Sequence, residues 1–407
     1  MQIYWNILVF FATSTVSVLG DIKQDVVYEF SSLTFESVSG VHSSSENVVT
    51  GIQVYNDTVY VNIPRLTPNV PVTLATVAKK NGKVVFKPFP TLQYQTLGNC
   101  DALQSVGAIR VVRKTNLLYI ADNKYLDCNA KLIIFDLVKR TIKKKYEFSS
   151  SDIDEKLNST QFEDIVVDGA GNAYIANAGK PGSIIVYRNK MSKSFVFYDR
   201  MLEIIDPVTF KFGNDSYNVN QSISEMTLSP DDDYLFFVIH YKKTVQVPTK
   251  SFEDIATRTR LQKIRTIGTK LAKGFGMLMG WRYMYLTGVE DKVVYVWDRN
   301  ADLEKQKGIV KYAGLVTMET QKELKVSPEL SLHPGKMSFD NHGNLWIITT
   351  DYQLYFRNST EGEGYETKIV KLKVDDSREK RTTSTAALDR KLLILLIIAT
   401  VMLCIVL

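Results

Sequence analysis

The feature that most constrains the fold of this chain is a short phrase that recurs along it. Residues 168–179 read DGAGNAYIANAG, and residues 340–351 read DNHGNLWIITTD. In each, an Asp is followed by a turn with Gly-Asn, then by apolar or aromatic residues, then by a polar residue. Two strands joined by a tight turn have this pattern, so both segments are predicted to form β-hairpins.

The hairpin pattern occurs six times. Its second strand is centred on Tyr60, Tyr119, Tyr174, Phe236, Tyr285 and Trp346, at successive spacings of 59, 55, 62, 49 and 61 residues. Further strands are predicted at residues 131–137, 183–189, 195–200, 292–298 and 352–358. Four-stranded units with a repeat of about 50 to 60 residues are typical of a β-propeller. The predicted fold class is therefore all-β, a six-bladed β-propeller, with a pair of β-sandwich domains as the alternative.

Composition agrees with an ordered globular protein. Of the 407 residues, 45% are hydrophobic and 23% are charged, which argues against wholesale disorder. The net charge of +6 is mild for this length, and no zinc-finger, RRM or KH pattern accompanies it. Nucleic acid is therefore not an expected partner.

Both ends of the chain are apolar and suggest processing in the secretory pathway. We expect residues 1–20 to be a signal peptide, 21–375 the propeller, and 376–391 a polar juxtamembrane linker. Residues 392–407 are an apolar run, expected to be either a GPI-attachment signal or a short transmembrane anchor. The expected location is the extracellular face of the plasma membrane.

Cysteines and glycosylation motifs fit that compartment. Cys404 lies in the apolar tail, which leaves Cys100 and Cys128 as one predicted disulfide, with two free buried thiols as the alternative. A bridge over this span would stabilise the fold by about 3–4 kcal/mol. Five Asn-X-Ser/Thr motifs predict N-glycosylation at Asn56, Asn158, Asn214, Asn220 and Asn358.

Several segments, taken in order, resemble the insect Yellow and major royal jelly protein family, which includes Yellow-related salivary proteins of blood-feeding flies. They are NIPRLTPNVPVTLATV (62–77), the stretch from Asn99 to Leu137, FEDIVVDGAGNAYIANAGKPGSIIVY (162–187), TVQVPTKSFED (244–254) and VVYVWD (293–298). The resemblance covers about residues 45–358, although a family cysteine is replaced around Arg113–Lys114. It implies a six-bladed propeller. It also implies either binding of a biogenic amine such as serotonin in the central channel or conversion of dopachrome.

Polar residues recur where the repeated strands end. The second strands end in Asp122, Asn177, His240, Thr287 and Thr350, and the first strands open with Thr50, Asp164, Glu225 and Lys336. In a propeller these positions are expected to converge on the axis and line a ligand pocket. The alternative is that each residue only satisfies the backbone of a nearby turn.

The last repeat allows the most direct comparison with the family. Amine-binding members tend to have Thr-Asp before its first strand and an Asn after its second. The matching positions here are Gly335-Lys336 and Thr350, with Tyr352 two residues after Thr350. Lys336 would repel a protonated amine unless a carboxylate neutralises it. It could instead favour an anionic ligand, or pair with Asp164 or Glu225 and close the channel.

Catalysis and cofactors have little support in the sequence. The four histidines form no metal motif, no cofactor is expected, and His240 is the candidate base if the protein is an enzyme. SPDDD (229–233) and DNHGN (340–344) are interpreted as turns rather than calcium loops. Residues 258–276 are rich in Lys and Arg and lack acids, so they are a candidate contact for a polyanion or protein partner, or else a solvated loop.

The leading hypothesis from sequence is a membrane-anchored propeller that captures a small ligand in its central channel. The alternatives are a cell-surface interaction or structural protein with a plugged channel, and an enzyme of the dopachrome-converting type. An enzyme is the less favoured class.

Overall fold

The computed structural model describes residues 21–148, 160–180, 182–203, 206–220, 222–252, 264–306, 317–357, 364–374 and 376. The expected signal peptide, the linker beyond residue 376 and the apolar tail lie outside the described residues, as do the motifs at Asn158 and Asn358. Within the described part, no helix is long and apolar enough to cross a membrane.

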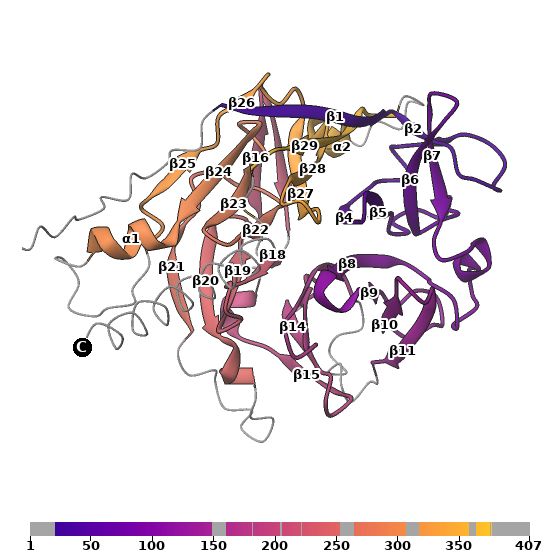
Figure 1. The fold of residues 1–407 in the computed structure, drawn as a ribbon, viewed down its shortest axis with the longest axis horizontal. Helices are drawn as coiled ribbons and strands as arrows, with labels where there is room; N and C mark the ends of the chain where they lie inside the picture. Colours follow the sequence, from indigo (N-terminus) through magenta and orange to yellow (C-terminus); the bar gives the residue numbers. More distant parts are fainter. Residues whose placement is uncertain are drawn as a thin grey trace, which may run out of the picture.

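Six sheets, the blades, stand around a central axis, which confirms the predicted six-bladed propeller (Figure 1). Their strands pair antiparallel, except that β26 pairs parallel with β1. Blade 1 contains β4 (Gly51–Tyr55), β5 (Thr58–Asn62), β6 (Leu74–Lys80) and β7 (Lys83–Pro88). Blade 2 contains β8 (Val106–Val112), β9 (Leu117–Asp122), β10 (Lys131–Asp136) and β11 (Thr141–Glu147). Blade 3 contains β12 (Phe162–Val167), β13 (Ala173–Asn177), β14 (Ser183–Arg188) and β15 (Lys193–Phe197).

The second half of the ring repeats this order. Blade 4 contains β18 (Ile223–Leu228), β19 (Tyr234–Ile239), β20 (Lys243–Pro248) and β21 (Arg265–Thr269). Blade 5 contains β22 (Met277–Met279), β23 (Tyr283–Gly288), β24 (Val293–Asp298) and β25 (Gln321–Glu323). Blade 6 contains β27 (His333–Phe339), β28 (Leu345–Thr350), β29 (Thr367–Leu372), β1 (Ile22–Phe30) and β26 (Val326–Ser327).

Strand β1 closes the ring. It comes from the start of the described chain, yet it pairs antiparallel with β29 in the last blade, from Gln24 opposite Leu372 to Phe30 opposite Thr367. The first and last parts of the propeller are therefore held in one sheet by backbone hydrogen bonds. The sequence pattern did not indicate this pairing, because β1 has no hairpin partner next to it in the chain.

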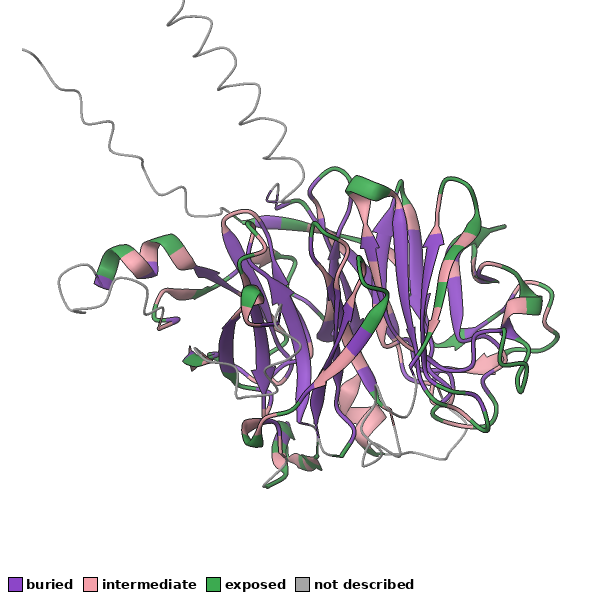
Figure 2. Ribbon diagram, turned by 90° about the horizontal axis from the view of Figure 1, so that it is seen from below, coloured by how far each residue is buried: buried purple, intermediate pink, exposed green. Residues whose placement is uncertain are grey.

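The second strand of each blade is apolar on both sides because each side packs on a different neighbouring blade. In β13, Tyr174 packs toward blade 4 whereas the next residue, Ile175, packs toward blade 2. The same alternation places Phe236 toward blade 5 and Phe237 toward blade 3. Successive side chains of a strand point to opposite faces, so a strand between two blades must be apolar at consecutive positions. Figure 2 shows these inner strands as buried.

The repeated phrase has one structural cause, which is an Asp that organises the turn between the first two strands. The carboxylate of Asp340 accepts hydrogen bonds from the backbone N–H of His342 at 2.8 Å and of Asn344 at 2.9 Å, and from the indole N–H of Trp346 at 2.9 Å. Asp168 does the same in blade 3, where Tyr174 donates its hydroxyl at 3.2 Å. The Asp, the Asn four residues on and the aromatic residue six residues on therefore form one unit.

Blade 5 lacks such an Asp in its turn, and a distant residue takes the role. The carboxylate of Asp376 accepts hydrogen bonds from Arg282 N, Tyr283 N and the hydroxyl of Tyr285, each at 3.1 Å. Burial and the facing Asp376 carboxylate raise the pKa of Tyr285. The turn of blade 5 is therefore completed by Asp376, which lies at the end of the described chain.

One predicted strand is a helix. Residues 352–358 were predicted to form a third strand, but α2 (Tyr352–Arg357) occupies this segment, and the third strand of blade 6 is β29. Asp351 starts the helix, since its carboxylate accepts from Leu354 N and its backbone carbonyl accepts from Tyr355 N. A side chain that accepts from the first free N–H groups favours a helix over a strand.

The remaining elements lie outside the blades. They are the hairpin β16 (Val208–Phe212) and β17 (Asp215–Val219), the short pair β2 (Ser32–Leu33) and β3 (His42–Ser43), helix α1 (Arg299–Gln306), and the 3-10 turns η1 (Leu92–Gln95), η2 (Arg113–Thr115), η3 (Arg200–Leu202) and η4 (Thr249–Phe252). Hairpin β16–β17 connects blade 3 to blade 4. It contributes to the aromatic cap described below.

The ring has two distinct ends. Because neighbouring strands are antiparallel, the turns between strands 1 and 2 of each blade and those between strands 3 and 4 of blades 1 to 3 lie at one end, which we call the turn face. The connections between strands 2 and 3, and between one blade and the next, lie at the other end, which we call the loop face. The turns at 229–233 and 340–344 lie on the turn face, where they join β18 to β19 and β27 to β28.

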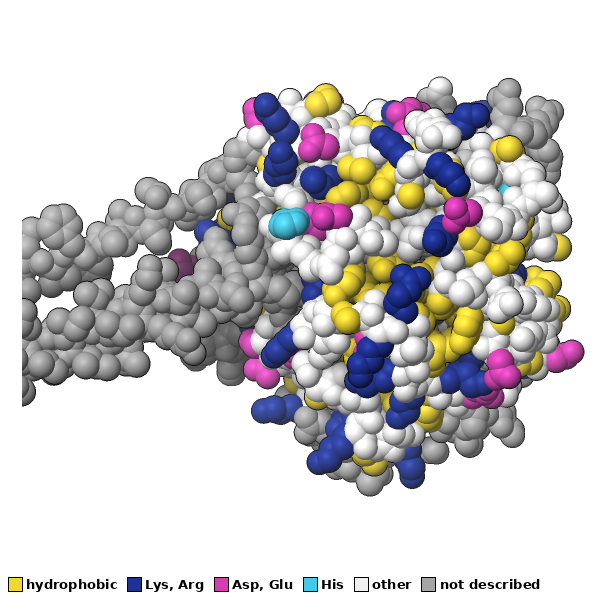
Figure 3. Space-filling view, turned by 45° about the vertical axis from the view of Figure 1, so that its right-hand side comes forward, with side chains coloured by type: hydrophobic (Ala, Val, Ile, Leu, Met, Phe, Trp, Pro, Cys, Tyr) yellow, Lys and Arg dark blue, Asp and Glu magenta, His cyan; other side chains and the backbone are white. Residues whose placement is uncertain are grey.

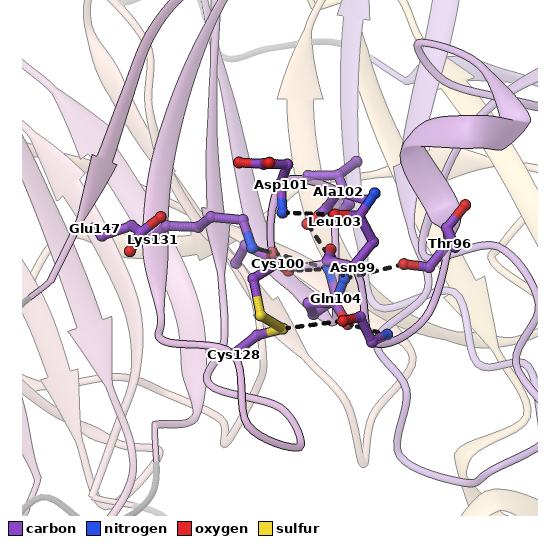
Figure 4. Close-up of a disulfide and its surroundings, with 12 residues drawn as sticks. Thr96, Asn99, Cys100, Asp101, Ala102, Leu103, Gln104, Cys128, Lys131 and Glu147 are labelled. Carbon is purple, nitrogen blue, oxygen red and sulfur yellow. Dashed lines mark hydrogen bonds and ion pairs between the residues drawn. A yellow bond between two sulfur atoms is a disulfide. The ribbon is translucent and has the colours of Figure 1, made fainter.

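A disulfide joins Cys100 to Cys128 and confirms the predicted pairing. It links the connection that leaves blade 1 to the loop between β9 and β10, so it ties two loop-face segments together (Figure 4). Gln104 supports the first segment, because its side-chain amide donates to the carbonyls of Thr96 at 3.2 Å and Asn99 at 2.7 Å.

Candidate functional site: the central channel and its mouth

The central channel is lined by the first strands of the blades, but it is almost filled by their side chains. The cavity at its loop-face end is lined by Thr50, Gly51, Ile52, Gln53, Asn62, Gly107, Ala108, Ile109, Arg110, Glu163, Asp164, Met277, Lys336 and Met337. The volume open to a water-sized sphere is only about 20 Å³. A cavity of that size holds about one water molecule and no aromatic ligand.

Lys336 crosses the channel. It belongs to the first strand of blade 6, and its Nζ lies 3.1 Å from Asp164 Oδ2 in blade 3 and 2.7 Å from the carbonyl of Ser224 in blade 4. Both ionised side chains are 16% exposed. Asp164 Oδ2 also accepts from the backbone N–H of Met226 at 3.0 Å. One cation therefore joins three blades across the axis.

A second ion pair lies directly behind the first. Lys270 Nζ donates to both carboxylate oxygens of Glu225, at 2.8 and 2.9 Å, and the two side chains are 1% and 0% exposed. Burial raises the pKa of Glu225 and lowers the pKa of Lys270, and the opposite charge of the partner counters each shift. Glu225 is thus committed to Lys270 and does not line the channel.

Other polar groups of the channel wall bind neighbouring blades. Gln53 Oε1 accepts from the backbone N–H of Val111 at 3.0 Å. Asn62 Nδ2 donates to Thr50 Oγ1 at 2.9 Å and to the carbonyl of Gly107 at 2.7 Å. The bonds of Gln53 to Val111 and of Asn62 to Gly107 hold blades 1 and 2 together, whereas the buried Asn62 Oδ1 has no hydrogen-bond partner within the described residues.

Of the residues expected at the axis, the structure brings together Thr50, Asp164 and Lys336 in the cavity wall. Asp122 is fully buried, where it accepts from Ser105 N at 2.7 Å and pairs with Lys131 at 2.9 Å. Burial raises the pKa of Asp122, whereas Lys131 and the backbone N–H groups lower it.

The other strand ends serve the loops beside them. Asn177 accepts from Gln161 N at 2.8 Å, and Thr287 Oγ1 accepts from Gly276 N at 2.8 Å. Thr350 contacts Thr367, its partner on the next strand. His240 lies outside the cavity wall, with its Nε2 3.3 Å from the carbonyl of Glu203.

Aromatic rings gather on the loop face, beside the first strand of blade 6. Hairpin β16–β17, helix α2, the connection before β22 and the connection between β19 and β20 bring together an aromatic cap. It contains Phe210, Phe212, Tyr217, Tyr241, Phe275, Tyr352 and Phe356. Ring centroids lie 4.9 Å apart for Phe210 and Tyr241, 4.9 Å for Phe275 and Tyr352, and 5.7 Å for Phe212 and Phe356.

The cap is held at both sides by polar contacts. Lys273 pairs with Glu290 at 2.7 Å and lies over the ring of Phe210 at 5.2 Å. At the other side, Asp215 accepts from Gln353 at 2.8 Å and pairs with Arg357 at 2.9 Å. Hairpin β16–β17 is therefore clamped between blade 5 and α2.

Tyr352 links the cap to the channel strand. A Cβ atom at Gly335 would lie 2.6 Å from the Tyr352 hydroxyl oxygen, so the absence of a side chain at Gly335 permits this approach. Gly335 and Tyr352, which were singled out from the comparison with the family, are therefore in contact with each other, and neither is left open for a ligand.

The sequence reasoning missed Gln53, Arg110, Glu163 and Met277 in the wall, and also the aromatic cap. Inward residues of the first strands would have been found by following the alternation inside each strand rather than its ends. The basic segment 258–276 is described from residue 264 only, and there Lys270 and Lys273 are engaged in the ion pairs above. Within the described residues, no group of three His, Cys, Asp or Glu could hold a metal ion.

A comparison with protein families gives a match over most of the chain. The family model described as Major royal jelly protein matches residues 115–382. No curated protein sequence matches the chain.

Solved structures similar to the chain include a luciferin-regenerating enzyme, at 10% identity, with 80% of this chain and 92% of that chain covered and a TM-score of 0.45. A gluconolactonase from Xanthomonas campestris is 11% identical, with 81% and 88% covered and a TM-score of 0.44. The β-propeller domain of Cps50 (Swd1) from Myceliophteria thermophila is 9% identical, with 85% and 99% covered and a TM-score of 0.42.

Proposed function

The chain belongs to the major royal jelly protein family, and we propose that it is a closed-channel member that acts as an interaction protein through its outer surface. The observation that carries this proposal is the position of Lys336, whose Nζ bridges Asp164 and Ser224 across the axis. The ammonium group occupies the space that an amine ligand would need, and it already neutralises Asp164 in that wall.

The size of the cavity supports the same proposal. An aromatic amine has roughly a dozen non-hydrogen atoms, whereas the cavity of about 20 Å³ accepts about one water molecule. Binding would require the ion pair between Lys336 and Asp164 to move. Breaking a largely buried ion pair by removing one partner costs about 3–5 kcal/mol, and most of the binding energy of a small ligand would be spent on that rearrangement.

Calorimetric titration of the protein with serotonin, dopamine and a set of small anions tests this proposal. We expect no binding heat at micromolar concentrations and no rise in melting temperature, because a ligand that binds the native state raises it in proportion to RT ln(1 + [L]/Kd). Micromolar binding of an amine by the unmodified protein would overturn the closed-channel proposal.

Small-ligand capture in the channel is the second candidate, favoured by the aromatic cap. Phe275, Tyr352 and Phe356 offer ring faces in the cap, and flat aromatic ligands stack on such rings. In this version, α2 moves away with Tyr352 and Phe356, and a ligand takes its place against the rings that remain, which include Phe210 and Phe275. The titration above decides between the two candidates, and Phe356→Ala would strengthen binding if movement of α2 limits access.

We further propose that the protein reaches the cell surface and is attached through residues 392–407, in agreement with the apolar run and the preceding small residues. Release of the protein from intact cells by phosphatidylinositol-specific phospholipase C would support a GPI anchor. Retention after that treatment, with extraction only by detergent, would support a transmembrane anchor. Recovery in the medium without either treatment would refute attachment.

A further inference from the structure

The positive charge of this protein is concentrated in one part of the ring. Residues 79–147, which run from the outer half of blade 1 to the end of blade 2, contain 14 Lys and Arg against five Asp and Glu. The whole chain has a net charge of only +6, so the remainder is net negative. Such a separation of charge creates a local field that attracts anions.

Three turns of the turn face carry part of this charge. They are the turn that joins β6 to β7, the turn that joins β8 to β9, and the turn that joins β10 to β11. The last two are hydrogen bonded, since Leu137 N donates to the carbonyl of Asn116 at 2.9 Å. Tyr55 of blade 1 donates its hydroxyl to Asn116 Oδ1 at 2.7 Å, which ties blade 1 to the same corner.

Some of the cations in this region already have partners. Lys80 and Lys87 lie 3.7 and 3.9 Å from Glu36, and Lys145 lies 2.5 Å from Asp101. Lys144 lies over the ring of Tyr187 at 5.5 Å. The ion pairs neutralise part of the local positive charge.

A set of exposed cations remains, which we call the basic corner. It consists of Lys83, Lys114, Lys139, Arg140 and Lys143. Each is exposed and forms no ion pair with another residue in the described part of the chain. Figure 3, in which the side of the ring that carries blades 1 and 2 comes forward, shows more Lys and Arg than Asp and Glu on that face.

The shape of the basic corner indicates the kind of anion that it fits. Lys83, Lys114, Lys139 and Arg140 lie in or beside turns of the turn face, whereas Lys143 lies on β11, the outermost strand of blade 2. The charges therefore run around an edge of the ring. A flat bilayer touches one side of such an edge, whereas a flexible linear polyanion can follow both sides.

The side chains also indicate which kind of linear polyanion the basic corner fits. Single-stranded nucleic acids are held by aromatic rings that stack on bases as well as by cations. Tyr55, the aromatic residue that is hydrogen bonded to this corner, is buried and offers no ring face to a base. Sulfate groups need cations alone, and clusters of five to eight residues rich in Lys and Arg are typical of heparin-binding patches.

We propose that the basic corner binds a sulfated polysaccharide through Lys83, Lys114, Lys139, Arg140 and Lys143. The binding is electrostatic, so it weakens as salt rises. It does not depend on whether the central channel is closed, because no residue of the corner lines the channel.

The test uses the full-length protein and a heparin-derived oligosaccharide, with affinity measured by calorimetry at about 0.15 M NaCl. The variant replaces Lys139, Arg140 and Lys143 with Gln. We expect binding by the unmodified protein and a loss of at least about tenfold in affinity for the variant, since three cations are removed from the contact. The melting temperature of the variant should stay within about 1 °C, because exposed substitutions seldom change stability.

A matched control replaces three equally exposed lysines on blades 4 and 5, Lys242, Lys243 and Lys322, with Gln. This control should retain affinity within about twofold. Failure of the unmodified protein to bind, or an equal loss in both variants, would overturn the proposal. So would binding of unsulfated hyaluronan as tight as that of heparin. Tighter binding to phosphatidylserine vesicles than to heparin would assign the corner to a lipid surface instead.

Discussion

Replacement of Lys336 by Met is the most direct test of how the ring is closed. Met keeps most of the length of the side chain but removes the ammonium group, and with it the bonds to Asp164 at 3.1 Å and to the Ser224 carbonyl at 2.7 Å. Asp164 would keep the hydrogen bond from Met226 N. Its carboxylate would then lack a cation in a site that is only 16% exposed.

The expected cost follows from that exposure. Exposed ion pairs contribute about 0–1 kcal/mol, and removal of one partner from a fully buried pair costs about 3–5 kcal/mol. Because water can reach part of Asp164, we expect Lys336→Met to destabilise the protein by about 2 kcal/mol. With an unfolding entropy of about 2.1 cal/mol/K per residue over a propeller of roughly 350 residues, this corresponds to a fall of about 3 °C in melting temperature.

Urea unfolding of Lys336→Met, Asp164→Asn and the double variant measures the loss of unfolding free energy and the coupling energy between the two residues. We expect a coupling of about 1–2 kcal/mol, because the double variant removes the unpaired carboxylate charge as well. Lys322→Met, at an exposed site on β25, is the control and should change the unfolding free energy by less than about 0.5 kcal/mol. A loss below about 0.5 kcal/mol for Lys336→Met, or a coupling near zero, would show that solvent screens the pair and that it does not tie the blades together.

Three further outcomes are expected. Asp340→Ala should lower the unfolding free energy by about 3 kcal/mol, since it leaves the buried indole N–H of Trp346 without an acceptor; an equal loss for Asp340→Ala in a Trp346→Phe background would contradict this reason. Burial and nearby Lys292 lower the pKa of His333, so the unfolded chain binds more protons below about pH 6.5 and stability falls there as the pH is lowered. His333→Gln should therefore show a smaller loss between pH 7.5 and pH 5 in calorimetric melts, and an unchanged loss would refute the assignment. Replacement of both Cys100 and Cys128 by Ser should cost about 3–4 kcal/mol in urea unfolding without a reducing agent, and addition of a reductant should bring the unmodified protein to the same stability.

Local patterns predicted the blades because each blade is built mostly from neighbours in the chain. The turn at 340–344 and the strands beside it lie within about 20 residues, and Asp340 and Trp346 are six residues apart. The same local logic failed for residues 352–358. There, apolar side chains suggested a strand, but Asp351 begins a helix whose rings pack on the distant hairpin β16–β17. The prediction that strand ends line the channel rested only on their position in each strand. Most of those side chains instead form hydrogen bonds with the loops next to them.

Sequence alone therefore determined the six hairpins, the fold class, the Asp-centred turns and the disulfide partner of Cys100, because each depends on short-range spacing or on a count of candidates. Tertiary structure decided what happens at the axis. Lys336 and Asp164 are 172 residues apart, and the aromatic cap joins segments near residues 210, 275 and 352. These contacts exist only once β1 pairs with β29 and brings all six blades around one centre, where charges from opposite sides of the ring can meet.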